Sequence, residues 1–236
     1  MANTFSNDIY HSTKTQSYLA IGLFAALIGS FLLMFILSFV QIVFTLPEVE
    51  LDTGENVPVT YIVIGLVAIL EILLRILTII FFLIWLHRAY KNLPALGAKN
   101  LEFSPGWAVG WWFIPFANLV KPYQIMSELW NASDSDFDPE LFLSNSIGTP
   151  SIISWWWGLF IIGNIVGRVA DKLESVNLAY SLVSLIIYCA LQGAAAFLII
   201  TIVRKITREQ ELRFQKLGAL NQFSTPPPPP TFDNRQ

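Results

Sequence analysis

Two oppositely charged residues, Glu71 and Arg75, stand in the middle of a long apolar stretch. A lone charge at the centre of a membrane-spanning helix costs about 2.5–3.5 kcal/mol on insertion scales, so such residues normally face a bundle interior or a cavity. There a carboxylate can relay protons or ions and a guanidinium can bind an anion. The spacing of four residues also lets the two side chains neutralise each other on one helical face. We favour this second interpretation, a structural ion pair.

Three alternating aspartates, Asp134, Asp136 and Asp138, resemble the start of a calcium-binding EF-hand loop. That loop needs glycine at its sixth position and glutamate at its twelfth, where this chain has Pro139 and Asn145. We therefore interpret the segment as a solvated acidic loop. The two histidines lie far apart, and no zinc-protease, P-loop or nucleophile-elbow motif is present. We expect no catalytic residues, no bound metal and no cofactor.

The composition places these residues in a membrane protein. Of 236 residues, 54% are hydrophobic and only 13% are charged, whereas soluble domains carry roughly 25% charged residues. Charges are absent from 15–47, 141–167 and 175–203, and about 20 apolar residues suffice to cross a hydrocarbon core of ~30 Å. The net charge of −3 gives no basic footprint for nucleic acid, so we expect no nucleic-acid partner.

We predict an all-α fold, a polytopic membrane helical bundle with four transmembrane helices and a re-entrant or interfacial Trp/Pro-rich helical element. The predicted membrane domain is 18–216, between a polar N-terminal segment at 1–17 and a disordered proline-rich tail at 217–236. Within it, the sequence places the spans at 18–46, 57–86, 152–170 and 178–203, and the Trp/Pro element at 103–130.

The distribution of Lys and Arg decides whether the Trp/Pro element crosses the membrane, because cytoplasmic loops carry an excess of both. If 103–130 crosses, six of these residues lie on each side. If it enters and leaves on one face, ten lie on the side of both termini, and only Arg168 and Lys172 lie opposite. We therefore predict four spans with both termini cytoplasmic. All eight tryptophans fall between 85 and 157, and in this topology each can sit at the cytoplasmic boundary.

The Trp/Pro element is where we place the function. If 106–114 is helical, its three tryptophans share one face, and Pro115 then ends or bends that helix. Pro122 starts a second, amphipathic helix with Ile125, Met126, Leu129 and Trp130 on its apolar face and Gln124, Ser127 and Glu128 opposite. Two short helices meeting at a polar turn would form a shallow aromatic pocket for a lipid headgroup or a partner helix. The candidate binding residues are Trp107, Trp111, Trp112, Asn118, Lys121 and Gln124. The alternative is a rigid cytoplasmic lid whose tryptophans only anchor it.

A pair of glycines, Gly163 and Gly167, forms a GxxxG pattern in the third span. Small residues let helix backbones approach closely. The fourth span offers a matching small face at Ala190, Gly193, Ala194 and Ala195, so we expect the glycines to pack this helical hairpin within one chain. Homodimerisation is the alternative.

Several long motifs resemble one family of bacterial membrane proteins. They are IWLHRAYKN at 84–92, LGA at 96–98, SPGWAVGWWFIPFANLVKPYQIMSELW at 104–130, WWWG at 155–158, GNIVG at 163–167 and IVRKITREQ at 202–210. Together they resemble the family called domain of unknown function 4328, over about residues 60–215. The resemblance implies a multi-pass protein of the bacterial inner membrane and no particular activity.

We therefore expect an integral membrane protein that is not an enzyme. The favoured function is a module that binds membrane lipids or a protein partner through the cytoplasmic-side 103–130 element. The alternative is a small transporter or channel, acting as a homo-oligomer, that uses Glu71 and Arg75 as an intramembrane polar site. An intramembrane enzyme has only Glu71 in its favour, as an acid.

Overall fold

The computed structural model describes residues 9–44, 59–134 and 150–224, and within these ranges it is helical with no strand. Four helices are long and apolar enough to cross a membrane, which confirms the predicted all-α bundle with four candidate spans. They are α1 (Lys14–Phe44), α2 (Val59–Lys91), α6 (Ser151–Glu174) and α7 (Leu178–Ser224).

The outer surface of the bundle is apolar, which is the reverse of a soluble protein. Large hydrophobic side chains point outward along the described parts of all four helices, among them Leu32, Phe39, Leu70, Ile162 and Phe197. Soluble monomers rarely expose contiguous apolar patches of more than a few hundred Å². A surface of this kind is stable where lipid chains surround it, so the chain is a multi-pass membrane protein.

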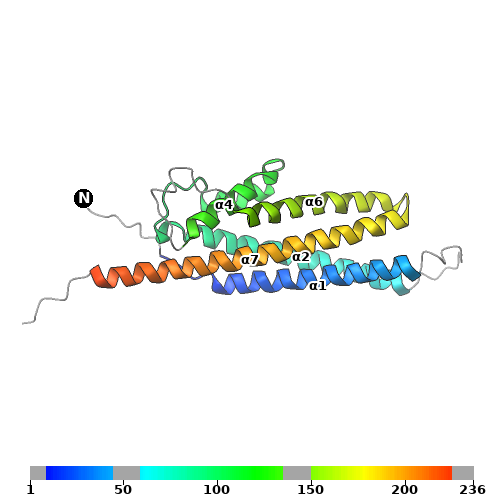
Figure 1. Cartoon of the computed structure of the whole chain (residues 1–236), viewed down its shortest axis with the longest axis horizontal. Helices are drawn as coiled ribbons and strands as arrows, with labels where there is room; N and C mark the ends of the chain where they lie inside the picture. Colours follow the sequence, from blue (N-terminus) through cyan, green and yellow to red (C-terminus); the bar gives the residue numbers. More distant parts are fainter. Residues whose placement is uncertain (1–8, 45–58, 135–149, 225–236) are drawn as a thin grey trace, which may run out of the picture.

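The long helices run antiparallel in pairs, and the chain's described ends lie at the same end of the bundle (Figure 1). α1 packs against both α2 and α7, and α6 packs closely along α7. The segment between α2 and α6 stays at the end where the described termini lie and does not run the length of the bundle (Figure 1). This arrangement agrees with the four-span prediction, because a crossing 103–130 segment would have placed α6 in the opposite direction.

The segment between α2 and α6 is built from short helical pieces separated by prolines. In chain order they are η2 (Pro94–Leu96), α3 (Pro105–Gly110), η3 (Trp111–Phe113), η4 (Ala117–Leu119) and α4 (Lys121–Ser133). The largest buried core of the protein joins these pieces to α2, α6 and α7. Its fully buried side chains include Trp85, Tyr90, Ile125, Met126, Leu129, Ile153, Ile202 and Ile206.

Two segments expected to lie outside the membrane domain belong partly to the packed structure. α1 begins at Lys14, four residues before the predicted span. Upstream of it, the Tyr10 ring stacks on Phe214 with centroids 4.4 Å apart. α7 continues without a break to Ser224, so residues 217–224 of the expected proline-rich tail are helical. The rest of that tail, 225–236, lies outside the described residues.

Candidate functional site

Residues 103–130 form a hairpin, called the 103–130 hairpin below. It begins with a short helix whose two ends are both determined by the local sequence. The Ser104 hydroxyl caps α3 by accepting a hydrogen bond from the Trp107 backbone N–H at 3.4 Å. Pro105 occupies the first turn of α3, where its missing N–H costs nothing. The helix tightens into the 3₁₀ turn Trp111–Phe113 and stops before Pro115, because proline cannot donate to the helical ladder.

The tip of the hairpin is a tight turn centred on Phe116. Phe116 has φ +65°, a value that few residues with a side chain adopt. On either side of it, the Ala117 N–H donates to the Pro115 carbonyl at 2.8 Å, closing a strained three-residue γ-turn. Such strain persists only where the surrounding structure holds it in place.

Polar groups around the tip satisfy its irregular backbone. The Asn118 amide donates from Nδ2 to the Trp112 carbonyl at 3.2 Å. From α6, the Trp157 indole N–H donates to the Leu119 carbonyl at 2.8 Å. Irregular backbone at membrane depth is tolerated only where protein or water satisfies it. These bonds satisfy two carbonyls of the turn, as a re-entrant segment would require.

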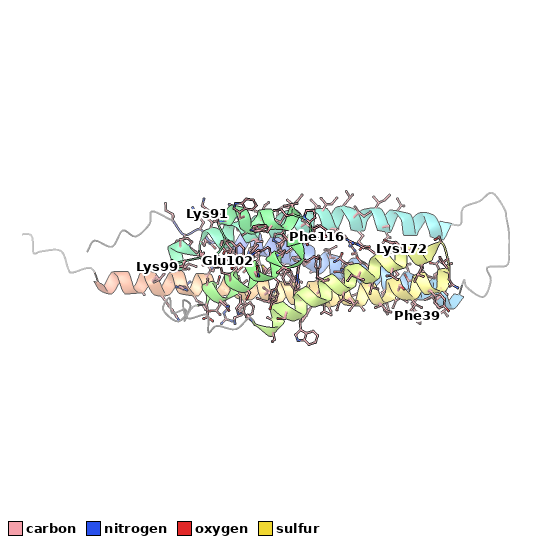
Figure 2. All side chains as sticks on the ribbon, turned by 90° about the horizontal axis from the view of Figure 1, so that it is seen from above. Phe39, Lys91, Lys99, Glu102, Phe116 and Lys172 are labelled. Carbon is pink, nitrogen blue, oxygen red and sulfur yellow. The ribbon has the colours of Figure 1, made fainter. Side chains whose placement is uncertain are left out.

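The hairpin reaches back along the bundle toward its opposite end. Figure 2 shows Phe116 closer to the Lys172 end than Glu102, Lys91 or Lys99. The Trp112 ring lies against Phe82 of α2, with centroids 5.4 Å apart. Phe82 lies nine residues before the end of α2 at Lys91, which is about 14 Å at 1.5 Å per residue. The tip thus extends part of the way along the helices and then returns through α4.

The outer surface of the tip is apolar. Phe116 is 86% exposed and Phe113 is 69% exposed. Four further apolar side chains of the hairpin are also exposed, namely Trp107, Ile114, Leu119 and Val120. The sequence had predicted a polar turn with an aromatic pocket, but Asn118 points its amide inward and the apolar side chains cover the outside. This geometry suits contact with lipid chains or an apolar helix.

The three tryptophans of the hairpin do not share one face, contrary to our expectation. Trp107 and Trp111 are neighbours, with ring centroids 5.2 Å apart. Trp112 lies elsewhere and packs edge-on against Trp157 of α6 at 5.9 Å. The spacing itself explains the difference, because residues four and five positions along a helix are rotated by about 40° and 140° from the first. Trp112 is therefore part of the core that holds the hairpin on α2 and α6.

Lys121, the predicted cation of the pocket, already has a partner. Its Nζ lies 3.2 Å from Glu102 Oε1 and over the rings of Phe103 and Trp111, at 5.0 and 5.8 Å from their centroids. Gln124, the third predicted polar residue, has its Oε1 buried with no described partner. The structure therefore places Lys121 in an exposed ion pair at the base of the hairpin.

Glu128 of α4 is a site residue that the sequence analysis did not single out. Its carboxylate accepts hydrogen bonds from the Tyr90 hydroxyl and from the Glu102 backbone N–H at 2.6 Å. Burial raises the pKa of the Glu128 carboxyl, and these two bonds oppose the rise. Glu128 thus ties the returning arm of the hairpin to α2 and to the entering arm. Ser127, also expected on the polar face of α4, is buried as well.

The long extension of α7 fixes the end of the hairpin. Gln210 donates from Nε2 to the Ala89 carbonyl at 2.9 Å and to the Ser133 hydroxyl at 3.0 Å. Arg213 donates to the Ala132 carbonyl at 3.2 Å. Nothing local in the sequence of α7 indicates these partners, which lie 77 to 121 positions away in the chain.

Glu71 and Arg75 form an ion pair inside the bundle. Arg75 Nε donates to Glu71 Oε1 at 3.1 Å, and a second guanidinium nitrogen contacts both that oxygen and the hydroxyl of Tyr188 on α7. The Arg75 guanidinium also lies over the Phe31 ring of α1, 5.3 Å from its centroid. Each charge is thus satisfied by the other and by neighbouring helices, as expected for a structural pair.

The glycines Gly163 and Gly167 face α7, but they do not meet its small residues. A Cβ at Gly163 would lie 3.0 Å from the Gln192 amide, and one at Gly167 would lie 3.0 Å from the Tyr188 ring. Large α7 side chains therefore fill the space that the glycines leave. Ala190 and Ala194, expected on this interface, are exposed instead. Packing within one chain is what the structure shows for this GxxxG pattern.

The predicted acidic loop can be followed only at its start. Asp134 ends α4, whereas Asp136 and Asp138 lie outside the described residues. Within residues 9–44, 59–134 and 150–224, no three His, Cys, Asp or Glu side chains gather in a way that could hold a metal ion.

Comparison with known proteins yields one match. The family model described as domain of unknown function (DUF4328) matches residues 53–208. That range contains α2, the 103–130 hairpin, α6 and the membrane part of α7. No curated protein and no solved structure matches the chain.

Proposed function

The chain belongs to the DUF4328 family, and from that premise we propose that it is a non-enzymatic membrane module that binds lipid or a partner's transmembrane helix through the 103–130 hairpin. The observation that carries the proposal is the tip of the hairpin. Phe116 is 86% exposed at the apex of a turn whose backbone is strained and held by neighbouring side chains. An exposed apolar group on a rigid support can bind an apolar partner without first being ordered.

The construction of the hairpin separates its supporting residues from its presenting residues. Trp112, Asn118 and Glu128 point into the protein and make its internal contacts. Phe113 and Phe116 are exposed and contribute little to its packing. This separation of supporting from presenting residues supports a binding role.

We propose that the protein lies in the inner membrane with both termini in the cytoplasm. The described ends and the hairpin lie at one end of the bundle (Figure 1), which carries ten Lys and Arg residues of the sequence. The α6–α7 turn at the opposite end has only Arg168 and Lys172 near it. This asymmetry follows the positive-inside rule, and it supports an orientation with the hairpin in the cytoplasmic leaflet.

A transport function through Glu71 and Arg75 has less support. The two charges neutralise each other, and Tyr188 and Phe31 complete the shell of the guanidinium. A relay needs a charge that can exchange partners along a wet path, whereas this pair is held between three helices. We retain transport as the alternative that the flux measurement below would restore.

The experiment compares Phe116→Asn with Phe39→Asn in the full chain. Asparagine tolerates a positive φ, so Phe116→Asn removes the apolar tip without adding backbone strain. Phe39 is also exposed, at 55%, but it lies on α1 far from the hairpin (Figure 2). We expect Phe116→Asn to lose co-purified lipid, seen by lipid mass spectrometry, or a protein partner, seen by pull-down. Phe39→Asn should keep both.

The outcome distinguishes the two binding classes and the competing function. Loss of lipid alone assigns the tip to lipid, and loss of a protein band alone assigns it to a partner helix. Unchanged lipid and protein content in a folded Phe116→Asn variant would overturn the proposal. Ion flux in proteoliposomes that Glu71→Gln abolishes without unfolding the protein would instead favour transport.

A further inference from the structure

A cleft of about 460 Å³ opens between α1 and the extension of α7. Its walls are the start of α1 and the extension of α7, which lie at the end of the bundle that holds the described termini (Figure 1). α1 contributes Lys14, Tyr18 and Ile21 to its wall, and α7 contributes Arg204, Arg208 and Leu212, among other residues. The cleft thus combines cationic and apolar side chains and shares no lining residue with the 103–130 hairpin.

The two faces of the α7 extension differ in burial and in their contacts. Ile206, Gln210 and Arg213 are buried, and the last two bond to the ends of α2 and α4. Arg204 and Arg208 are exposed and line the cleft toward α1. They lie four residues apart, so they are neighbours on the helix surface. Packing therefore accounts for the first face and leaves the two arginines of the second unexplained.

The charges in the cleft are not balanced. Lys14 forms an ion pair with Glu211 at 3.0 Å, and Glu211 also accepts a hydrogen bond from Tyr10. Arg204 and Arg208 have no hydrogen bond or ion pair within the part of the chain that the structure describes. Three cations and one carboxylate line the cleft, which leaves two positive charges side by side.

The cleft lies at the level of the lipid headgroups. Lys14 is the last charged residue before the uncharged run of the first span, and Arg204 is the first after that of the fourth. Both residues line the cleft, so the polar ends of the first and fourth spans meet there. Tyr18, which is 69% exposed at this level, is a residue type enriched at such boundaries.

We propose that this cleft binds the phosphate group of an anionic phospholipid. The guanidinium groups of Arg204 and Arg208 donate hydrogen bonds to the phosphate oxygens, a geometry that arginine matches in a bidentate manner. Ile21 lies on the membrane side of the two arginines and contacts the acyl chains where these leave the headgroup, and Leu212 lies on the opposite, cytoplasmic side of the cleft. The site is independent of the 103–130 hairpin and stands whether or not the hairpin binds anything.

The test uses the full chain in nanodiscs of phosphatidylcholine containing a minor fraction of phosphatidylglycerol. Native mass spectrometry counts the phosphatidylglycerol molecules that stay bound after release. We compare the wild type with Arg204→Gln/Arg208→Gln and with Lys91→Gln/Lys99→Gln. The second variant removes two exposed charges from the same end of the molecule, outside the cleft, and so controls for overall charge.

We expect the wild type to retain phosphatidylglycerol selectively and the double arginine variant to bind it about thirty-fold more weakly, since each basic residue near an anionic surface is worth about 1 kcal/mol. The double lysine variant should match the wild type. Equal loss in both variants would mean attraction by overall charge, and an absence of selectivity in the wild type would mean no site. Either result would overturn the proposal.

Two further measurements separate the effect of the cleft's shape from the effect of its charges, and a lipid ligand from a free anion. Leu212→Trp narrows the cleft and keeps both arginines, so it should also reduce the retained phosphatidylglycerol. Full retention in that variant would show that the cleft is not the site. Inorganic phosphate at millimolar concentration should not displace the lipid. If it does, the ligand is a soluble phosphate and the assignment to a lipid is wrong.

Discussion

Removal of either charge from the Glu71–Arg75 pair should destabilise the bundle, and removal of both should destabilise it less. Arg75→Leu leaves the carboxylate of Glu71, which is only 9% exposed, without a hydrogen bond among the described contacts. Stranding a buried charge in this way costs about 3–5 kcal/mol. Glu71→Leu leaves Arg75 with the Tyr188 hydroxyl and with the rings of Tyr188 and Phe31. A desolvated cation–π contact is worth about 2 kcal/mol, so we expect a smaller loss of about 1–3 kcal/mol.

The double variant Glu71→Leu/Arg75→Leu replaces both charges by apolar side chains. Such replacements are often neutral or stabilising, so its free energy of unfolding should exceed that of Arg75→Leu. The measurement is equilibrium unfolding in mixed micelles of increasing SDS content, followed by tryptophan fluorescence. Thr78→Val is the matched control on α2, because the Thr78 hydroxyl donates to the Leu74 carbonyl of its own helix. It should cost at most about 1 kcal/mol.

Two results would refute this reasoning. A double variant less stable than Arg75→Leu would show that the Glu71 carboxylate left without Arg75 is not a costly buried charge. A Glu71→Leu variant less stable than Arg75→Leu would show that Tyr188 and Phe31 do not support the stranded guanidinium. Either result would remove the basis for regarding the pair as a structural element that three helices share.

Three further predictions follow from single contacts. Burial raises the pKa of Glu128 above its ordinary value of 4.5, so the free energy of unfolding should fall as pH rises from 4.5 through the raised pKa. Glu128→Gln should remove that dependence, and a variant with the same pH profile as the wild type would contradict the prediction. Gly167→Ala should destabilise, since its Cβ would meet the Tyr188 ring at 3.0 Å, whereas Gly193→Ala, with nothing within 4 Å, should stabilise by about 0.5–1 kcal/mol; thermal unfolding of both in one detergent checks the order. Reporter fusions after Lys99 and at the C-terminus should read cytoplasmic and a fusion after Lys172 should not, and an inside signal after Lys172 would sink the four-span topology.

The long helices were predictable because a membrane span is determined by the composition of its own stretch of sequence. An apolar run of about 20 residues needs no partner to be recognised as a span, and the four predicted spans match α1, α2, α6 and α7. Their ends were less predictable. α7 continues 21 residues past the expected end of its span at 203, because contacts with distant segments stabilise the charged extension. Gln210 bonds to Ala89 and Ser133, and no periodicity within α7 encodes those partners.

The same distinction explains what was missed in the hairpin. Prolines and aromatic residues marked the segment as unusual, and the buried face of α4 at Ile125, Met126 and Leu129 followed from helical spacing. The orientation of the tip did not follow. Trp112 packs on Trp157 of α6 and not beside Trp107, and whether Lys121 stays free depends on Glu102, 19 positions earlier in the chain. Turn geometry and long-range pairing are set by the folded context, which spacing alone does not contain.

The shape of the hairpin is imposed from outside, and this makes its tip the most informative position. An isolated chain would not hold Phe116 at φ +65°, because strained conformations persist only where neighbours determine them. Trp157 of α6 bonds to the Leu119 carbonyl on one side of the turn, and Glu128 joins the two arms at the base. Packing and hydrogen bonds of the bundle therefore hold in place a side chain that is itself 86% exposed. Stability gains little from that exposure, and this is why we propose that the Phe116 turn contacts a partner outside the chain.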